Sequence, residues 1–231
     1  MPEVRDHLAI ALDTDDLVEA LRLAKAVQPW FGVAKVGLEL FCAEGPDAVT
    51  ALNEMGFKVF LDVKLHDIPT TVNRAARVLG ALGPAYVTLH AQPGPVTLRA
   101  GVDGLAEGAA AAGVDPPVAL AVTVLTSDPD APAHILGQRV AAAVAAGCGG
   151  IVCATADVRE AKQLAPRLLA VVPGIRPAGS DPNDQARPAT PGAALTAGAD
   201  LLVVGRAVTR ADDQAAAAEA IAGEVSVAAR G

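Results

Sequence analysis

Eight short apolar runs, most of them rich in β-branched residues, recur along the chain with room for a helix between neighbours. Segments rich in Ala and Leu, with apolar residues at helical spacing, separate them. This alternation predicts parallel βαβ units. The expected strands are residues 7–13, 33–37, 58–64, 85–90, 118–125, 150–154, 169–174 and 201–205. The clearest expected helices are residues 15–27, 70–81, 138–146 and 212–222, and residues 101–117 are expected to form a long helix and loop.

Helix starts are marked by capping residues. Asp15 suits an N-cap, and Pro46, Pro69 and Pro191 suit the first turn of a helix. Eight strand–helix units without a strong linker favour an α/β fold, a closed (β/α)8 TIM barrel that forms a single domain over residues 1–231. The alternative is an open doubly wound sheet, which has the same strand–helix alternation.

Composition narrows the class of protein. The chain has 231 residues, 52% of them hydrophobic, which is enough for one large core. It contains no uninterrupted apolar stretch of about 18 residues, so we expect no membrane span. Its first residues show no basic segment followed by an apolar one, so we expect no secretion signal, and its three cysteines are an odd count at irregular spacing. Both features favour a reducing, cytoplasmic location. The cysteine pattern also argues against a zinc site or a disulfide framework.

Charge and motifs exclude further classes. The net charge of −8 argues against nucleic acid as a partner. It also means that an anionic substrate must be attracted by a local positive pocket. No GxGxxG follows the first apolar run and no P-loop is present, which argues against a nucleotide cofactor.

The most informative segment is residues 62–71, with the sequence DVKLHDIPTT. It places Asp62, Lys64 and Asp67 at the end of a strongly apolar stretch. Residues two apart on a strand share a face, so Asp62 and Lys64 are expected to point the same way. Charges buried at a strand end need partners or a ligand, because unpaired burial is costly. The segment therefore indicates a functional site.

In a (β/α)8 barrel the chemistry lies at the carboxyl ends of the strands. The last two ends are the usual phosphate position of this fold, and here they carry Arg176 and the pair Gly205–Arg206. Residues 176–190 are polar and are expected to form a lid in which Gln185 reaches a phosphate oxygen. The alternative is a solvated connection. The other polar strand ends are Asp13, Lys35, Asp62, Lys64, Asp67, His90, Thr126 and Ser127.

Lys35, Asp62, Lys64 and Asp67 alternate in sign, so each charge has a potential partner. A protonated lysine beside a reacting carbon is a general acid. A fixed carboxylate next to it penalises a substrate carboxylate but not the product that has lost CO2, which is the electrostatic logic of a metal-free decarboxylase. The alternative is a structural salt-bridge ladder at the barrel end. His66 and His90 are interpreted as structural.

Several blocks, in order, resemble orotidine 5′-phosphate decarboxylase over nearly the whole chain. The Asp-x-Lys-x-x-Asp core is shared with a wider superfamily, whereas the His-Asp-Ile-Pro and Pro-Gly-Ile-Arg blocks are more specific. Leu65 stands where Phe is common in the family. The matching blocks are Ile10-Ala11-Leu12-Asp13, Lys35-Val36-Gly37, residues 62–69, Leu125-Thr126-Ser127, Pro173-Gly174-Ile175-Arg176 and Val204-Gly205-Arg206.

The resemblance implies a reaction and a role for each residue. Orotidine 5′-phosphate would lose CO2 to give UMP without cofactor or metal, with Lys64 protonating C6 and Asp62 against the substrate carboxylate. Lys35 would complete the charge network and, with Asp13, contact the ribose. The remaining implied contacts are Thr126 and Ser127 to the pyrimidine, Arg176, Gln185, Gly205 and Arg206 to the phosphate, and Asp67, Ile68 and Thr71 lent to the neighbouring site of a homodimer.

Two other functions stay open. A sugar-phosphate enzyme of the same superfamily would need Mg²⁺ and further carboxylates, for which Glu39 and Glu44 are the only acids near the second strand end. A non-catalytic nucleotide-phosphate binder would be expected to lack at least one of the four charged residues of the network. Activity that persists in EDTA would argue against the sugar-phosphate enzyme, and any catalytic turnover would argue against the binder.

Overall fold

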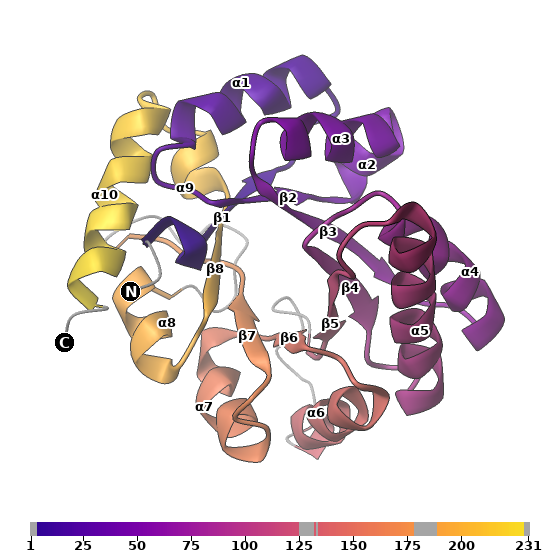
Figure 1. Cartoon of the computed structure of the whole chain (residues 1–231). Coiled ribbons are helices and arrows are strands. Elements are labelled where there is room, and N and C mark those ends of the chain that lie inside the picture. The colour runs from indigo at the N-terminus through magenta and orange to yellow at the C-terminus, as the bar shows by residue number, and fades with distance from the viewer. Residues whose placement is uncertain (1–3, 125–131, 133, 178–188, 229–231) are drawn as a thin grey trace.

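The computed structural model describes residues 4–124, 132, 134–177 and 189–228. Its strands close into one parallel barrel in the order β1 to β8, with β8 paired to β1. Figure 1 looks along the barrel and shows the helices arranged around it. The predicted TIM barrel is confirmed, and the open sheet is wrong. The strands are β1 Leu8–Leu12, β2 Val33–Val36, β3 Lys58–Leu65, β4 Tyr86–His90, β5 Val118–Val122, β6 Gly150–Val152, β7 Leu169–Val172 and β8 Leu201–Val204.

Helices follow the strands, and two connections carry an extra helix. No helix among the described residues is long and apolar enough to cross a membrane. A short 3-10 helix, η1 (Val4–His7), precedes β1. The α-helices are α1 Leu17–Val27, α2 Leu38–Glu44, α3 Pro46–Glu54, α4 Pro69–Gly80, α5 Pro95–Ala112, α6 His134–Ala146, α7 Thr155–Leu164, α8 Pro191–Ala197, α9 Arg206–Thr209 and α10 Gln214–Ala228.

The predicted element ends differ from the structure in specific places. Pro46, Pro69 and Pro191 begin helices as expected. Asp15 does not cap α1, because Asp16 is the N-cap and its carboxylate accepts the Glu19 N–H at 2.9 Å. Five strands end one or two residues earlier than predicted, β5 ends three residues earlier, and β3 ends one residue later. Helix α5 begins at Pro95, before the predicted segment.

Two layers of apolar side chains hold the barrel together. Successive strand residues point to opposite faces, so one set fills the barrel and the other packs under the helices. The outer layer is larger and includes Ile10, Leu61 and Leu89. The inner layer consists of Ala9, Ala11, Val33, Phe60, Leu120, Val171, Leu201 and Val203, with Tyr86, Val118 and Val152 packed against it.

Helices α4 and α5 pack unusually closely, and glycine makes this packing feasible. A Cβ placed on Gly108 would lie 2.8 Å from the Arg77 carbonyl carbon and 3.1 Å from the Ala81 nitrogen. Gly104 faces the Asn73 carbonyl in the same way, and the Asn73 side chain donates to the Ala100 carbonyl at 3.0 Å. The helix that begins directly after residues 62–68 is therefore held by backbone-to-backbone contact.

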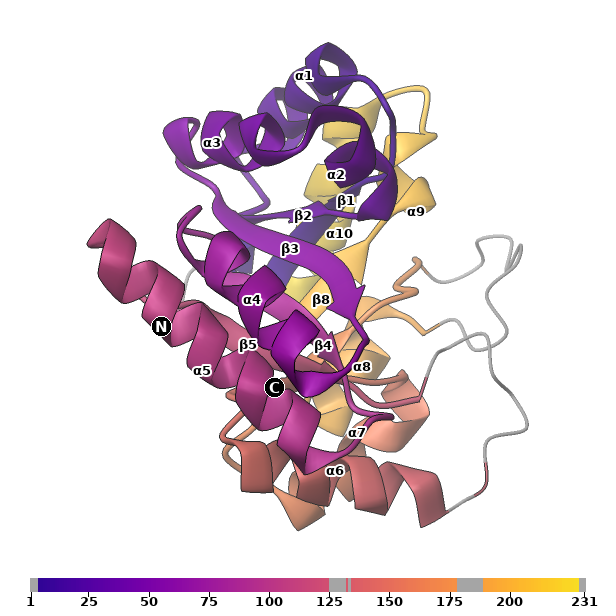
Figure 2. The ribbon, with the colours of Figure 1, turned by 90° about the vertical axis from the view of Figure 1, so that its right-hand side faces the viewer.

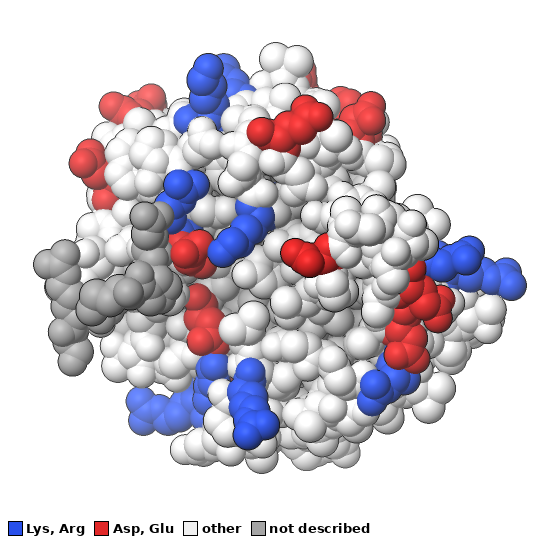
Figure 3. Space-filling model, in the orientation of Figure 1, with Lys and Arg blue, Asp and Glu red and all other residues white. Residues whose placement is uncertain are grey.

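The two ends of the barrel differ. Strand β3 runs toward the right-hand side of Figure 2, so the carboxyl ends lie there and the amino ends face the viewer in Figure 1. Acidic and basic side chains are interspersed over the amino-end face in Figure 3, where the described residues form no extended area of one sign. Two ion pairs at this end are Lys58–Asp6 at 3.0 Å and Lys162–Asp200 at 2.6 Å.

Candidate functional site

Charged side chains stand at the carboxyl end of the barrel because they continue its inner layer. Asp13, Lys35 and Asp62 each lie two residues after an inner-layer residue, namely Ala11, Val33 and Phe60. Since strand side chains alternate, a step of two keeps the same direction. The sequence thus changes from apolar to charged at one level of the barrel, and this level is where the site lies.

The structure links these side chains into a chain of ion pairs. The Lys35 ammonium lies 3.0 Å from Asp13 Oδ1 and 3.8 Å from Asp62 Oδ2. The Lys64 ammonium lies 2.8 Å from the same Asp62 oxygen. The side chains of Lys35 and Asp62 are only 11% and 14% exposed. Two lysines and two aspartates balance each other, so the group is electrically neutral, and each lysine faces a carboxylate. Its centre, Lys35 and Asp62, is buried, whereas Asp13 is largely exposed.

Asp67 does not join this chain. Its carboxylate accepts the Ile68 N–H at 2.6 Å, and the described residues give it no ion pair. Asp67, Ile68 and Thr71 are all exposed, around the start of α4. Of the four charges predicted to form one network, the structure therefore brings together three, and Asp13 supplies the fourth.

The backbone of β3 is irregular at the site. Leu61 pairs with Val87 and Leu65 pairs with Leu89, so four residues of β3 advance while β4 advances by two. Within this bulge Lys64 has φ 48°, and it is the one non-glycine residue with positive φ in the described chain. Such backbone strain is characteristic of functional positions. Asp62 and Lys64 line the same cavity, as the sequence predicted, but the strand between Leu61 and Leu65 is not the regular one that the prediction assumed.

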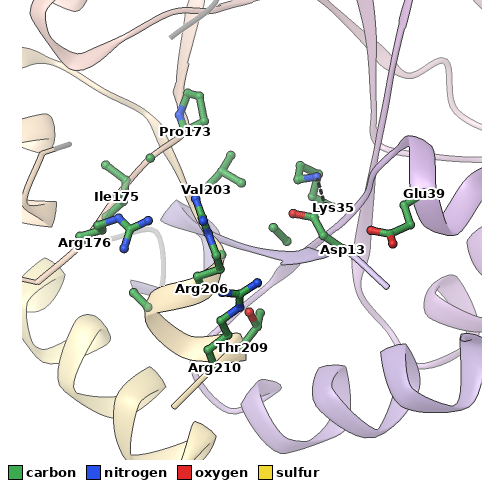
Figure 4. Close-up of a pocket in the computed structure, with 14 residues that line it drawn as sticks. Asp13, Lys35, Glu39, Pro173, Ile175, Arg176, Val203, Arg206, Thr209 and Arg210 are labelled. Atoms are coloured by element: carbon green, nitrogen blue, oxygen red, sulfur yellow. Dashed lines mark hydrogen bonds and ion pairs between the residues drawn. The ribbon is translucent and has the colours of Figure 1, made fainter. Parts of the chain in front are cut away.

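A cavity of about 470 Å³ opens beside the ion pairs. Figure 4 shows Arg176 and Arg206 on one side of it and the Asp13–Lys35 pair on the other. Arg176 is 8% exposed, so its charge acts in a largely desolvated setting. Gly205 and Arg206 open the short helix α9 at the end of β8. A rim of buried and half-buried guanidinium groups suits a phosphate.

Three further polar residues that line this cavity were not predicted as ligand contacts. Thr209 and Arg210 follow Arg206 by three and four residues, and Glu39 lies in the first turn of α2. The sequence does contain a signal for Thr209 and Arg210, because residues three and four positions after Arg206 lie on the same face of a helix.

A second cavity of about 160 Å³ lies next to the first and shares Lys35, Pro173 and Val203 with it. Asp62 and Lys64 line it, and its remaining wall is mostly apolar. Cys153 belongs to this wall, and burial raises the pKa of its thiol to about 12, so it stays protonated. The pair of cavities offers an anion grip at one end and a lysine–aspartate pair in a drier pocket at the other. The second cavity is lined by Lys35, Phe60, Asp62, Lys64, Val122, Val124, Val152, Cys153, Pro173 and Val203.

His66 and His90 stack on each other, with ring centroids 5.0 Å apart. Burial lowers the pKa of His90 to about 4, helped by electrostatic repulsion from His66, Arg139 and Lys64. His90 is therefore neutral at pH 7. Because the Gln92 N–H donates to His90 Nδ1 at 3.1 Å, the proton of the neutral ring lies on Nε2.

Some predicted residues lie outside the described part of the chain. They are Thr126, Ser127 and Gln185, together with residues 178–188 of the expected lid. Within the described ranges, no group of three or more His, Cys, Asp or Glu side chains is arranged to hold a metal ion.

Comparison with known proteins gives consistent results. The model of the orotidine 5′-phosphate decarboxylase / HUMPS family matches residues 6–221. Orotidine 5′-phosphate decarboxylase of Anaeromyxobacter sp. (strain K) is 46% identical over 94% of this chain and 97% of its own length. The enzyme of the same name from Frankia casuarinae is 43% identical over 99% of this chain and 91% of its own. The crystal structure of orotidine 5′-phosphate decarboxylase from Lactobacillus acidophilus aligns with a TM-score of 0.78 at 34% identity, covering 94% of this chain and 98% of that one.

Proposed function

Because the chain belongs to the orotidine 5′-phosphate decarboxylase / HUMPS family, we propose that it is a carboxy-lyase that converts orotidine 5′-phosphate to UMP and CO2 in pyrimidine biosynthesis. The observation that carries the proposal is the adjacency of two features. A cavity of about 470 Å³ that Arg176 and Arg206 line shares Lys35 with a smaller, more apolar cavity that contains the Asp62–Lys64 pair. A nucleoside monophosphate matches these two cavities, because it has a charged phosphate at one end and a flat base at the other.

The phosphate is placed in the larger cavity. Arg206 and Arg176 supply permanently charged donors, and the Gly205 backbone allows a close approach of an oxygen. Lys35 lines both cavities and Asp13, 3.0 Å from it, lines the larger one, so ribose hydroxyls would meet them there. Gln185 would add a phosphate contact, and Thr126 and Ser127 would contact the pyrimidine. The binding free energy of the phosphate contacts would hold the base against Asp62 and Lys64.

The chemistry is placed at Lys64. As the bond between C6 and the carboxylate breaks, CO2 leaves and the electron pair stays at C6. The Lys64 ammonium donates its proton to that carbon, and the amine later regains a proton from solvent. Asp62, held 2.8 Å from the Lys64 ammonium, orients it and lies where the substrate carboxylate would be repelled, a repulsion that disappears as CO2 forms. No step in this scheme requires a metal or an organic cofactor.

The site is proposed to be completed across a homodimer. Asp67 and Ile68 are exposed beside the site, and Ile68 is 65% exposed although it is a large apolar side chain. Asp67 has no ion pair among the described residues. We assign Asp67, Ile68 and Thr71 to the active site of a second copy of the chain, where burial against the partner would remove the apolar surface from water.

The direct test is the ultraviolet absorbance of orotidine 5′-phosphate mixed with the purified protein in EDTA. Rapid conversion to UMP is expected. Turnover of a sugar phosphate that depends on Mg²⁺, without turnover of orotidine 5′-phosphate, would place the chain in the other branch of the family. Binding of UMP without turnover of either substrate would make it a nucleotide binder.

A further inference from the structure

We propose that Thr88, through its hydroxyl group, is a positioning residue for the reaction: it holds both Asp62 and Lys64 in their working geometry. Thr88 lies in the middle of β4, is 0% exposed and does not line either cavity. Thr88 therefore has no proposed contact with the substrate. The inference rests on the proposed function for its kinetic consequence, but its structural basis is independent of the substrate.

The Thr88 hydroxyl makes two hydrogen bonds to the two reacting residues. It donates to Asp62 Oδ1 at 3.0 Å and accepts the backbone N–H of Lys64 at 2.8 Å. A hydroxyl has one proton to donate and lone pairs to accept, so one oxygen atom serves both partners. A single side chain from the neighbouring strand thus bridges the carboxylate and the main chain of the proposed proton donor.

The bond to the Lys64 N–H coincides with the strained part of β3. Thr88 lies between Val87 and Leu89, the two β4 residues that pair on either side of the bulge. Lys64 holds φ 48° there, a conformation that a lysine adopts only where its surroundings enforce it. The buried hydroxyl gives the Lys64 N–H a partner in that conformation, and it thereby favours the bulged backbone over a regular strand.

The bond to Asp62 fixes the direction of its carboxylate. Oδ1 is held by Thr88, which leaves Oδ2 to face both ammonium groups, at 2.8 Å from Lys64 and 3.8 Å from Lys35. Without the hydroxyl, rotation of the carboxylate would change both ion-pair distances. Catalytic groups need placement within fractions of an ångström, and second contacts of this kind provide it.

The test compares substitutions that separate the hydroxyl from the packing. Thr88→Val keeps the shape and removes the hydroxyl, whereas Thr88→Ser keeps the hydroxyl and removes a methyl group. Thr123→Val is the matched control, because Thr123 is also 0% exposed and follows β5, but its hydroxyl donates to the Val152 carbonyl at 2.8 Å. That carbonyl retains the Thr123 N–H as a donor.

We expect Thr88→Val to lower kcat by about 10- to 100-fold with KM within about threefold, as for loss of a hydrogen bond to a charged group that matters in the transition state. Thr88→Ser and Thr123→Val should keep kcat within about threefold of the unsubstituted protein. The proposal is overturned if Thr88→Val keeps its kcat, or if the serine variant is as slow as the valine variant. Should Thr88→Val not fold, the pair Thr88→Ser and Thr88→Ala decides, since the two differ by one oxygen atom and equal kcat values would refute the role.

A crystal structure of Thr88→Val separates this inference from the proposed function. If the unsubstituted protein does not decarboxylate orotidine 5′-phosphate, the proposed function fails and the kinetic comparison does not apply. The positioning role still predicts that Lys64 leaves the positive-φ region or that the contact of 2.8 Å between Asp62 and Lys64 is lost in the variant. Unchanged geometry at both places would refute it in that case.

Discussion

Replacing Gly108 by Ala is a sharp test of the packing that carries α4. In an ordinary exposed helix interior this change stabilises by about 1 kcal/mol, because alanine has the higher helix propensity. At Gly108 the added Cβ would lie 2.8 Å from the Arg77 carbonyl carbon, and α4 offers backbone there rather than a flexible side chain. Since non-bonded carbons pack at about 3.5–4.0 Å, the two helices must separate by roughly 1 Å.

Overpacking of this kind costs typically about 1–3 kcal/mol, and a backbone neighbour places Gly108 at or above the upper end. We therefore expect Gly108→Ala to lower the free energy of unfolding by about 2 kcal/mol or more after the gain in helix propensity. For a chain of this size that corresponds to roughly 2–4 °C in Tm per kcal/mol. Helix α4 begins directly after Ile68, so turnover is expected to fall as well.

Gly223→Ala is the control for this prediction. Gly223 lies in the interior of α10, and a Cβ there would meet no atom within 4 Å. Alanine should stabilise it by about 0.5–1 kcal/mol. Urea unfolding followed by far-UV circular dichroism measures both variants against the unsubstituted protein. If Gly108→Ala proved as stable as Gly223→Ala, the close packing of α4 on α5 would be refuted.

Three further predictions concern the site. Lys64→Ala should abolish turnover while UMP binding stays measurable by calorimetry, and normal turnover would refute the proton-donor role. Arg206→Ala should raise KM by about 10- to 100-fold, the effect of losing hydrogen bonds from a charged group, with a smaller change in kcat; an unchanged KM would contradict the phosphate grip. His90 has a pKa of about 4 in the folded chain, below its usual 6.5, so its contribution to stability is complete above pH 6.5 and is lost as pH falls toward 4. Urea unfolding should show a slope of up to about 1.4 kcal/mol per pH unit in this range that is reduced in His90→Asn, and an equal slope in both proteins would count against it.

The alternation of apolar and polar residues was sufficient to predict the eight strands and the barrel. It also predicted that Asp62 and Lys64 lie on one side, and both do line one cavity, although the bulge in β3 breaks the regular alternation on which that prediction relied. The ends of the strands were less accurate, because Gly37 and Gly174 continue an apolar pattern although they lie outside the strands. Asp15 and Asp16 are equally good caps by composition, and only the backbone geometry distinguishes them.

The contacts within the site depend on pairing between strands, which one sequence does not specify. Nothing local to Asp13 indicates that it meets Lys35 at 3.0 Å, and the neutral cluster therefore has a different member from the one predicted. Thr88 has the composition of an ordinary strand residue, and the bulge opposite it leaves no mark in the periodicity of residues 58–65. The bulge and the contacts of Thr88 become visible only when β3 and β4 lie side by side.

The pairing of β8 with β1 has a consequence for synthesis of the chain. Asp13 follows the first strand and Arg206 follows the last, yet both line one cavity across this seam. Asp13 is synthesised long before Arg206, so this cavity cannot be complete until β8 and Arg206 have left the ribosome. A bound nucleotide would bridge the first and last strands, and it should slow the opening of the seam and the proteolysis that opening permits.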